Sequence, residues 1–298
     1  MGKYPKTNND KSKNPSKSLL VVGNLAKDVI FGVEHFGGCA ATISLTLSWL
    51  GFEVDVLSVV GKDNFSEKFV DHLNRHGVGV KYIYRDIENI PICEVTSSEN
   101  SNSRSNWIDN GCHDAMDNMD ESHLPDHDYD TVHLVSSPPK LSRLIADNFS
   151  DISYEPGPLL LSNHRYFDPY VAEKTNLVFL NEEEYEAVLD YQKGISPKGY
   201  DFSFDVVIVT LGKKGSKLIK QNGSEVFIPV DPVEEDFQNP GGAGDNYTAG
   251  FLFGYLYGFS FENSAKFGSR LGSECVKQKN GILPKERVET IYQKNRLL

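Results

Sequence analysis

The sequence has few cysteines, no long apolar segment and none of the common histidine metal motifs. Its four cysteines lie far apart without C-x-x-C spacing, which argues against a zinc site and against a secreted disulfide framework. The eight histidines show no H-E-x-x-H spacing, and no G-x-x-x-x-G-K-[ST] sequence is present, so a P-loop NTPase is not expected. Because no window approaches a membrane span, we expect no membrane partner and a cytoplasmic location.

The net charge limits the kinds of partner to be expected, and the N-terminal composition indicates where the folded domain begins. The 298 residues carry a formal net charge of −12 and are 39% hydrophobic, which suffices for one large α/β domain. Residues 1–18 are rich in Lys, Asn, Ser and Pro, and we expect a disordered tail there before a single domain at residues 19–298. The lysines of the tail are also compatible with a nucleic-acid-binding arm, but the net negative charge argues against a nucleic-acid partner.

Alternating aliphatic runs and amphipathic segments indicate the fold class. Strands are expected at residues 53–60, 131–135, 177–180 and 206–209, and helices at residues 66–76 and after Asp245 and Ser260. This alternation favours an α/β fold with a doubly wound, mainly parallel sheet flanked by helices, in which ligands bind at the carboxyl ends of the strands. Outside this pattern, the β-prone runs 91–97 and 103–109 predict a hairpin.

A glycine-rich stretch, Asn239-Pro240-Gly241-Gly242-Ala243-Gly244-Asp245, precedes an apolar-rich segment that ends at Tyr257. Glycines before a helix let the main chain approach a phosphate, and the free N–H groups of a helix start bind anions. Asp245 falls in the first turn, where a carboxylate can accept the proton of an attacking hydroxyl group. The stretch therefore predicts phosphoryl transfer. The alternative is a turn into a core helix, with Asp245 as an ordinary N-terminal carboxylate.

Further motifs favour the catalytic interpretation. They are Leu19-Leu20-Val21-Val22-Gly23-Asn24 followed by Asp28, Phe36-Gly37-Gly38-Cys39-Ala40-Ala41-Thr42, Val59-Val60-Gly61-Lys62-Asp63, Asn181-Glu182-Glu183-Glu184, and Val209-Thr210-Leu211-Gly212-Lys213-Lys214-Gly215. With the glycine-rich stretch, they resemble in type and order the motifs of the ribokinase-like (PfkB) family of sugar and nucleoside kinases. The resemblance extends over residues 19–288 and implies a ribokinase-like fold with a small β lid, a kinase activity, ATP and Mg²⁺.

The resemblance also implies a role for each matching residue. Asp245 would be the catalytic base, and the N–H groups of the preceding residues would stabilise charge on the transferred phosphoryl group. These preceding residues are Gly242, Ala243 and Gly244. The acceptor-binding residues would be Asp28, Gly37, Gly38 and Thr42. The nucleotide-binding residues would be Asn181, Glu184, Thr210, Gly212, Gly215 and Asn280. Glu184 would hold Mg²⁺ through water, whereas Asn280 also fits a helix C-cap, which we favour over an adenine contact.

Several positions depart from the family pattern. Thr42 stands where the family carries asparagine, and Asn239 and Pro240 replace an aspartate and a threonine. Without the aspartate charge, we expect weak binding of a monovalent cation and little activation by K⁺. Because only residues 29–36 separate Asp28 from Gly37, the lid is expected to be reduced, with its strands within residues 81–109, or to be completed by a partner subunit of a homodimer. Such a short lid resembles that of inositol kinases.

The sequence thus predicts an ATP-dependent kinase that phosphorylates a hydroxyl group of a small sugar, cyclitol or nucleoside. The short lid favours an inositol-like acceptor, while sugars and nucleosides remain open. The competing hypothesis is a non-catalytic nucleotide- or sugar-binding regulator on the same fold, motivated by Thr42, Asn239 and Pro240. Retention of Asp245 beside its glycines argues against the regulator.

Overall fold

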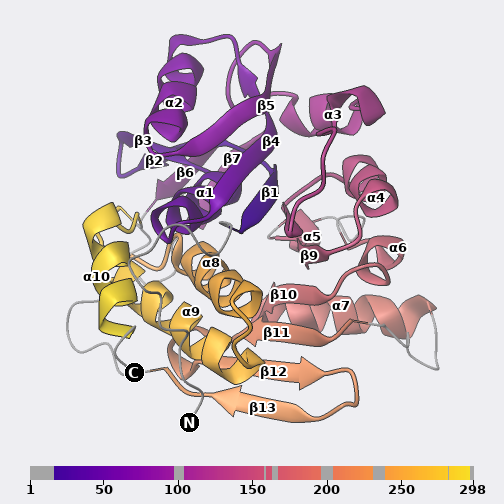
Figure 1. The fold of residues 1–298 in the computed structure, drawn as a ribbon. Coiled ribbons are helices and arrows are strands. Elements are labelled where there is room, and N and C mark those ends of the chain that lie inside the picture. Colours follow the sequence, from indigo (N-terminus) through magenta and orange to yellow (C-terminus); the bar gives the residue numbers. More distant parts are fainter. Residues whose placement is uncertain are drawn as a thin grey trace.

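A nine-stranded sheet forms the centre of the protein (Figure 1). The computed structural model describes residues 17–96, 104–157, 159–162, 167–195, 204–230, 239–280 and 282–295. In spatial order the strands are β13 (Glu225–Ile228), β12 (Ser216–Lys220), β11 (Val206–Thr210), β10 (Leu177–Asn181), β9 (Ile152–Glu155), β8 (Thr131–Val135), β1 (Ser18–Gly23), β4 (Glu53–Gly61) and β5 (Val78–Ile87). Neighbours from β11 to β5 pair in parallel, whereas β12 and β13 pair antiparallel. The expected doubly wound, mainly parallel sheet is therefore confirmed.

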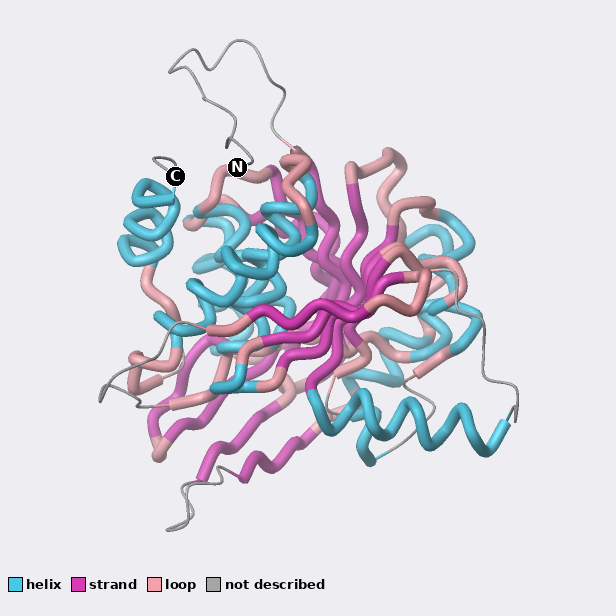
Figure 2. Tube along the Cα trace, turned by 90° about the horizontal axis from the view of Figure 1, so that it is seen from below, coloured by secondary structure: helices cyan, strands magenta, loops and turns pink. Residues whose placement is uncertain are grey.

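Helices cover both faces of the sheet (Figures 1 and 2). In β1, Leu19 and Val21 join one hydrophobic core and Leu20 and Val22 join the other, because alternate side chains of a strand point to opposite faces. The first core includes side chains of α1 (Cys39–Trp49), α2 (Asn64–Arg75), α8 (Ala243–Leu256), α9 (Phe261–Cys275) and α10 (Lys285–Asn295). The second includes side chains of α3 (Cys112–Asp117), α4 (Pro139–Asn148), α5 (Leu159–Ser162), α6 (Pro169–Ala172) and α7 (Glu182–Ile195). Burial on both faces explains why these strands are continuous apolar runs.

Glycines allow α8 and α9 to pack closely. A Cβ atom at Gly250 would lie 2.8 Å from the Cα of Gly268, and one at Gly268 would lie 2.5 Å from the Tyr247 carbonyl oxygen. A larger side chain at either position would push the two helices apart. Since Asp245 lies in the first turn of α8, this packing also fixes where its carboxylate sits relative to the sheet.

A second sheet of four strands accompanies the main sheet (Figure 1). Its order is β3 (Val33–Gly37), β2 (Ala26–Ile30), β6 (Ile92–Thr96) and β7 (Arg104–Ile108). The hairpin predicted at 91–97 and 103–109 corresponds to β6 and β7. The expectation that lid strands lie only within residues 81–109 is wrong, because β2 and β3 come from residues 26–37. The short segment suffices because Phe31 and Gly32 have φ values of 51° and 79°, as in the tightest hairpin turns.

The two faces of this second sheet carry different residues. Asp28 lies opposite His35 on β3 and opposite Cys93 on β6, and Cys93 lies opposite Trp107 on β7. Residues paired in this way have their side chains on one face. We call His35, Asp28, Cys93 and Trp107 the inner row, whereas neighbours along the strands, such as Lys27, face the other way.

The fold begins earlier in the chain than residue 19. The Lys17 ammonium group lies 2.7 Å from Asp130 Oδ1, and the Ser18 N–H donates to Asp130 Oδ2 at 2.9 Å. Lys17 and Ser18 therefore belong to the domain and not to the tail, while residues 1–16 lie outside the described part. Within the described ranges, no helix is both long and apolar enough to cross a membrane.

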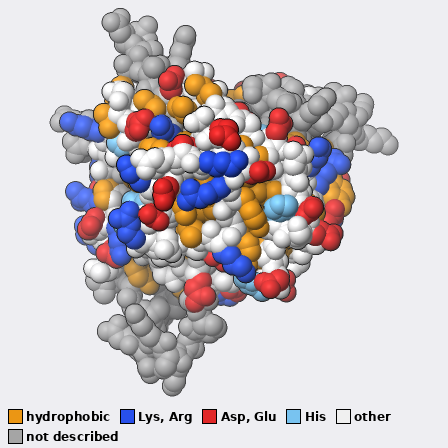
Figure 3. Space-filling model, turned by 90° about the horizontal axis from the view of Figure 1, so that it is seen from above, with side chains coloured by type: hydrophobic (Ala, Val, Ile, Leu, Met, Phe, Trp, Pro, Cys, Tyr) orange, Lys and Arg blue, Asp and Glu red, His pale blue; other side chains and the backbone are white. Residues whose placement is uncertain are grey.

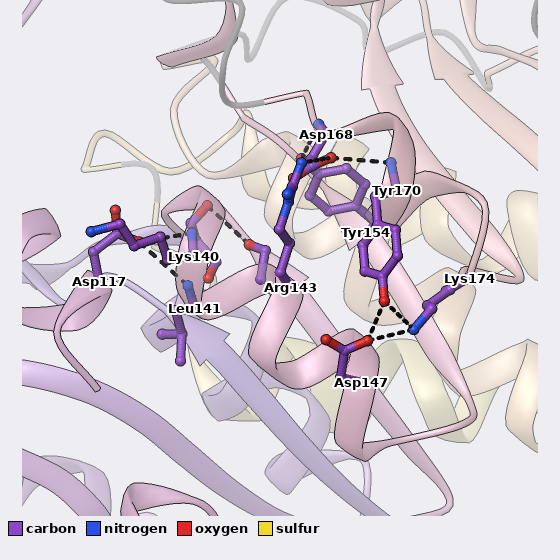
Figure 4. A network of polar contacts seen from close by, with 11 residues as sticks. Asp117, Lys140, Leu141, Arg143, Asp147, Tyr154, Asp168, Tyr170 and Lys174 are labelled. Carbon is purple, nitrogen blue, oxygen red and sulfur yellow. Dashed lines mark hydrogen bonds and ion pairs between the residues drawn. The ribbon is translucent and has the colours of Figure 1, made fainter. Parts of the chain in front are cut away.

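A polar network ties α4 to α6 beside the end of β9 (Figure 4). Asp168 is the N-cap of α6, where its carboxylate accepts the Tyr170 N–H and pairs with the Arg143 guanidinium of α4. The Asp168 N–H in turn donates to the Tyr154 hydroxyl at 3.3 Å. Because Tyr154 directly precedes Glu155, this network fixes the end of β9 and the carboxylate that follows it.

The surface mixes charges of both signs. Seen from above (Figure 3), basic and acidic side chains lie next to one another around hydrophobic groups, and the basic ones form no continuous strip on this face. A nucleic-acid surface instead gathers its lysines and arginines on one face. Phe31, Val33 and Ile108, all of the second sheet, are exposed hydrophobic residues.

Candidate active site

Helix α8 begins with an open N-terminus. Gly242 is its N-cap in a left-handed conformation, and no side chain caps this helix in the described part of the chain. The N–H groups of the first turn have no acceptor within the helix, although that of Ala243 donates to the Pro240 carbonyl oxygen at 3.3 Å. A Cβ atom added to Gly244 would meet no heavy atom within 4 Å, so the space beside these groups is open. This helix start can therefore take an anion.

Buried side chains hold the helix start in position. The Asn246 amide donates to the Gly242 carbonyl oxygen at 2.8 Å and accepts the Thr46 hydroxyl of α1 at 2.9 Å. Both Asn246 and Thr46 are buried. Their hydrogen bonds fix the first turn of α8 to the helix that begins at Cys39.

Asn239 braces the same loop from its other end. Its buried side chain accepts the Gly241 N–H at 2.8 Å and donates to the Lys279 carbonyl oxygen at 3.1 Å. The side chain thus has a structural role in which no negative charge is needed. Its one oxygen already accepts a hydrogen bond, which leaves it a weak ligand for a cation.

Asp28 reaches the site from the second sheet. Burial and the neighbouring Asp245 charge raise the pKa of Asp28 to about 7, and a hydrogen bond from the Gly38 N–H opposes this rise. A Cβ atom at Gly37 would lie 1.9 Å from Asp28 Oδ2. Glycine at position 37 is therefore required for the Asp28 carboxylate to lie against the start of α1.

Asp245 and Glu155 are close enough to titrate together. Burial and the Glu155 charge raise the pKa of Asp245 to about 7, while a hydrogen bond from the Cys39 thiol lowers it. Burial likewise raises the pKa of Glu155 to about 7, against a 2.9 Å hydrogen bond from the Thr248 hydroxyl. Two carboxylates in one buried place resist ionising together. Asp245 is thereby matched to accept a proton near neutral pH.

Glu155 lies beside Asp245, although its place in the sequence did not single it out. It ends β9, and groups at the carboxyl ends of parallel strands face the ligand site. His133 Nε2 lies 3.7 Å from its carboxylate, but burial lowers the pKa of His133 to about 3, so His133 is neutral and supplies no counter-charge. The sequence signal was weak, because Glu155 follows only Ile152-Ser153-Tyr154, which is too short and too polar to be recognised as a buried strand.

Asn181 and Glu184 form a reciprocal cap at the start of α7. The Glu184 N–H donates to Asn181 Oδ1 at 2.8 Å, and the Asn181 N–H donates to Glu184 Oε2 at 2.9 Å. This capping box explains their spacing structurally. However, burial raises the pKa of Glu184 to about 7 with contributions from the Glu155 and Asp245 charges, against the hydrogen bond from Asn181. Glu184 therefore belongs both to the cap and to the carboxylate cluster.

Four buried carboxylates form a cluster that fits a divalent cation coordinated largely by water and phosphate oxygens. They are those of Asp28, Glu155, Glu184 and Asp245. Burial raises each of these pKa values, and neighbouring negative charges raise those of Asp28, Glu184 and Asp245 further, so a nearby cation would be favoured. Among the described residues, no three acidic, histidine or cysteine side chains converge closely enough to bind a metal directly. Mg²⁺ commonly keeps several waters and uses substrate phosphates as ligands. The arrangement fits that mode of binding.

The remaining predicted residues make local contacts. The Thr42 hydroxyl lies 3.5 Å from the Gly38 carbonyl oxygen of its own helix. Thr210 ends β11, and Gly215 has a φ of 114°, where a Cβ atom would lie 2.1 Å from a β13 carbonyl oxygen. The expectation that Asn280 caps the preceding helix is wrong, because α9 ends at Cys275 with Val276 as its C-cap. The Asn280 side chain instead accepts the Ile282 N–H at 3.2 Å. None of these described contacts joins the carboxylate cluster.

Three polar side chains are buried just beyond the carboxyl ends of β1 and β8. Asn24 Oδ1, Ser136 Oγ and Ser137 Oγ have no hydrogen-bond partner among the described residues. Ser136 also has a φ of 46°, an unfavourable backbone conformation that is concentrated at functional sites. Buried polar groups are normally hydrogen-bonded, so these three atoms are exceptions, and they expose almost no surface that a ligand could contact.

Comparison with known proteins gives consistent matches over nearly the whole chain. Residues 16–287 match the pfkB family carbohydrate kinase. The nucleoside kinase of Methanocaldococcus jannaschii is 26% identical over 283 residues, which cover 88% of this chain and 91% of that protein. The Burkholderia thailandensis nucleoside kinase in complex with inosine superposes with a TM-score of 0.74 at 17% identity, covering 93% and 95% of the two chains. The fructokinase of Xylella fastidiosa with bound ATP gives a TM-score of 0.77 at 15% identity, covering 94% and 99%. These similarities confirm the ribokinase-like fold.

Proposed function

Because the chain belongs to the pfkB family of carbohydrate kinases, it is a phosphotransferase, and we propose that it transfers the γ-phosphoryl group of ATP to a hydroxyl group of a small sugar, cyclitol or nucleoside. One observation carries this proposal. The Asp245 carboxylate lies at the open start of α8 and within electrostatic reach of Asp28 on the second sheet. An acceptor hydroxyl group held by Asp28 would lie beside both the base and the anion-binding N–H groups.

Asp245 is the proposed general base. As the acceptor oxygen forms its bond to the γ-phosphorus, Asp245 takes the hydroxyl proton, and the bond from the γ-phosphorus to the bridging oxygen breaks to release ADP. The N–H groups of Gly242, Ala243 and Gly244 donate to the oxygens of the group in transfer. Asp28 orients the acceptor by accepting hydrogen bonds from its hydroxyl groups.

Glu184 and Glu155 are the residues proposed to hold Mg²⁺ through water. When bound, the cation would neutralise phosphate charge. Both carboxyl groups have pKa values of about 7, so binding of a cation there would release protons at neutral pH.

The connection after β11 is the proposed nucleotide side of the site. Thr210 pairs with Asn181 across β11 and β10, and so lies next to the strand end that carries the Glu184 cap. Gly212 and Gly215 follow within the tight turn to β12, where the backbone can approach a nucleotide. Asn280 is a further candidate for contact with the adenine of the nucleotide.

ADP release in the presence of Mg²⁺ and ATP tests the proposal. The acceptor panel would contain ribose, fructose, myo-inositol, inosine and adenosine. We expect ADP formation that depends on an acceptor and matches the amount of phosphorylated acceptor. A protein that binds ATP or an acceptor and yet forms no phosphorylated product with any of them would be the regulator of the competing hypothesis.

Replacing Cys39 by alanine should shift the pH dependence of the reaction. The thiol hydrogen bond lowers the pKa of Asp245, so its loss raises that pKa, and the base then becomes deprotonated only at higher pH. The acid limb of kcat/KM should move upward by roughly 0.5–1 pH unit, since a thiol is a weak donor to a charged acceptor. Burial and the Glu155 charge set the starting value near 7. Asp28 and Glu184 also face this site and have pKa values of about 7.

The pH profile of kcat/KM from pH 5.5 to 9.5 measures this shift, with Cys39→Ser as the matched variant that keeps a donor. At high pH the Cys39→Ala rate should approach that of the unmodified protein. A uniform loss at every pH would contradict the role of the thiol and indicate a packing defect.

Activity should change little with K⁺. The Asn239 side chain is neutral and bound to Gly241 and Lys279, so position 239 offers no carboxylate to a monovalent cation. Initial rates at fixed Mg²⁺ and ionic strength, with KCl exchanged for the chloride of a bulky organic cation, measure the effect. Asn239→Asp is the matched variant, in which the restored charge should introduce a K⁺ response. Many-fold stimulation of the unmodified protein would mean that backbone carbonyls build the cation site without a charged residue.

A further inference from the structure

The inner row of the second sheet leads from Asp28 to a tryptophan. Cys93 lies directly opposite Asp28, and Trp107 lies directly opposite Cys93. Burial and the Asp28 charge raise the pKa of Cys93 to about 11, which agrees with a thiol and a carboxylate on the same face. Since adjacent strands are about 4.8 Å apart, Trp107 lies roughly 10 Å from Asp28 along this row.

Trp107 is held from its far side by α3 and the residues before it. Its ring centroid lies 5.9 Å from that of His113. Burial raises the pKa of Asp109, but hydrogen bonds from His113 outweigh burial and leave this pKa below its usual range. Helix α3 packs in turn on β4, where the Cys112 thiol lies 3.8 Å from the Val59 carbonyl oxygen. The indole is therefore fixed at the junction between the second sheet and the main sheet.

These positions define the size and chemistry of an acceptor. An acceptor whose sugar hydroxyl groups bind Asp28 would reach Trp107 only if an aromatic group extends it along the inner row. A free sugar or cyclitol bound at Asp28 would leave the indole uncovered. A base attached to the sugar would cover the indole. Every nucleobase has a flat aromatic face that can stack on an aromatic side chain.

We infer that Trp107 stacks on the base of a nucleoside, so that the acceptor of the proposed reaction is a nucleoside and not a free sugar or a cyclitol. This inference rests on the proposed function, because it assigns the acceptor of the same site. Trp107 is a specificity-determining residue: it contributes to binding of the base and takes no part in the transfer of the phosphoryl group.

Tryptophan fluorescence tests the contact without turnover. The chain has two tryptophans, so Trp49→Phe leaves Trp107 as the only one. Trp49 lies in α1 and packs edge-on against His76, away from the inner row. Titration of this variant with inosine, with excitation on the long-wavelength edge of indole absorption, should quench the fluorescence in a saturable manner. Ribose and myo-inositol at the same concentrations should leave it unchanged.

Acceptor kinetics provide the second test. Trp107→Ala should lower kcat/KM for inosine and adenosine by about 10- to 100-fold, which is the range expected for loss of one base-stacking contact. The effect should appear mainly in KM, should spare kcat/KM for ribose, and should be largely reversed in Trp107→Phe. Ile108→Ala is the matched control, because Ile108 is the next residue of β7, faces the other way and is 39% exposed.

The outcomes separate this inference from the proposed function. Turnover of a free sugar or cyclitol that exceeds nucleoside turnover, or an equal loss for ribose and inosine in Trp107→Ala, would overturn the inference while leaving a kinase. Saturable quenching by inosine without phosphorylation of any acceptor would support the nucleoside contact and reject the kinase. Quenching by ribose equal to that by inosine would also overturn the stacking role.

Discussion

Replacing Asp245 by asparagine should lower kcat by about 10²- to 10⁴-fold, which is the usual contribution of a general base. Asparagine keeps the size of the side chain but cannot take the proton of the acceptor hydroxyl group. The fold should persist, because the helix start is held by Asn246 and Thr46 rather than by Asp245 itself. Nucleotide binding should remain or strengthen, since one buried negative charge is removed from beside the anion site.

Single-turnover measurement with saturating ATP and acceptor gives the decisive number, and binding of an ATP analogue to the same variant provides the control. Glu186→Gln is a matched neutralisation of an exposed carboxylate on α7 and should retain full turnover. A folded Asp245→Asn variant with near-normal turnover would reject the base assignment. The same variant should also lower the pKa values of Asp28 and Glu184, because the Asp245 charge contributes to raising both.

The carboxylate cluster gives the site its pH behaviour. Asp28, Glu155, Glu184 and Asp245 come from β2, β9, α7 and α8, and each has a pKa of about 7. Strongly shifted pKa values of several groups in one place are typical of functional sites. The groups interact, so the observed titration steps belong to the cluster as a whole. Ligands that bring positive charge, such as a hydrated divalent cation, would lower these pKa values and leave the base free to act.

The sequence predicts those parts of the site that are local in the chain. Asp245 and its glycines are adjacent residues, and the Asn181 to Glu184 spacing lies within one helical turn, so both can be recognised without knowing the fold. Asp28 is found because an acidic residue follows a buried strand. In each case the site residue lies at a helix start or a strand end, and a few neighbouring residues are enough to predict that position.

Other parts depend on contacts between distant segments. Glu155 becomes part of the site only because β9 places it beside the helix that carries Thr248 and Asp245. The Cys39 thiol reaches Asp245 across more than two hundred residues of chain. Neither contact can be predicted from the spacing of residues in the sequence, because both depend on how the sheet arranges distant segments of the chain.

The second sheet shows how a short segment can be misjudged. Residues 29–36 looked too few for lid strands, yet a turn with two positive φ values lets β2 and β3 pair directly. Only the register of the complete sheet places Trp107 in line with Asp28. The resemblance to inositol kinases depended on the short lid, and the four-stranded sheet removes that support.

Replacing Asp28 by alanine should raise the KM for the acceptor by about 10²- to 10⁴-fold while changing the KM for ATP little. A carboxylate that accepts two hydroxyl hydrogen bonds contributes about 1.5–3 kcal/mol through each, and these contacts are made to the acceptor and not to phosphate. Part of the loss will be offset because removal of the Asp28 charge relieves its repulsion with Asp245.

Gly37→Ala provides an independent route to the same result, because its Cβ atom would lie 1.9 Å from Asp28 Oδ2 and displace the carboxylate without removing it. Initial-rate measurements that vary ATP and acceptor separately give both KM values for each variant. A fall in ATP affinity with unchanged acceptor affinity would mean that Asp28 serves the nucleotide side of the site. The same measurements separate the roles of Asp28 and Trp107. Loss of Asp28 should weaken the binding of every acceptor, whereas loss of Trp107 should weaken the binding of only those acceptors that carry a base.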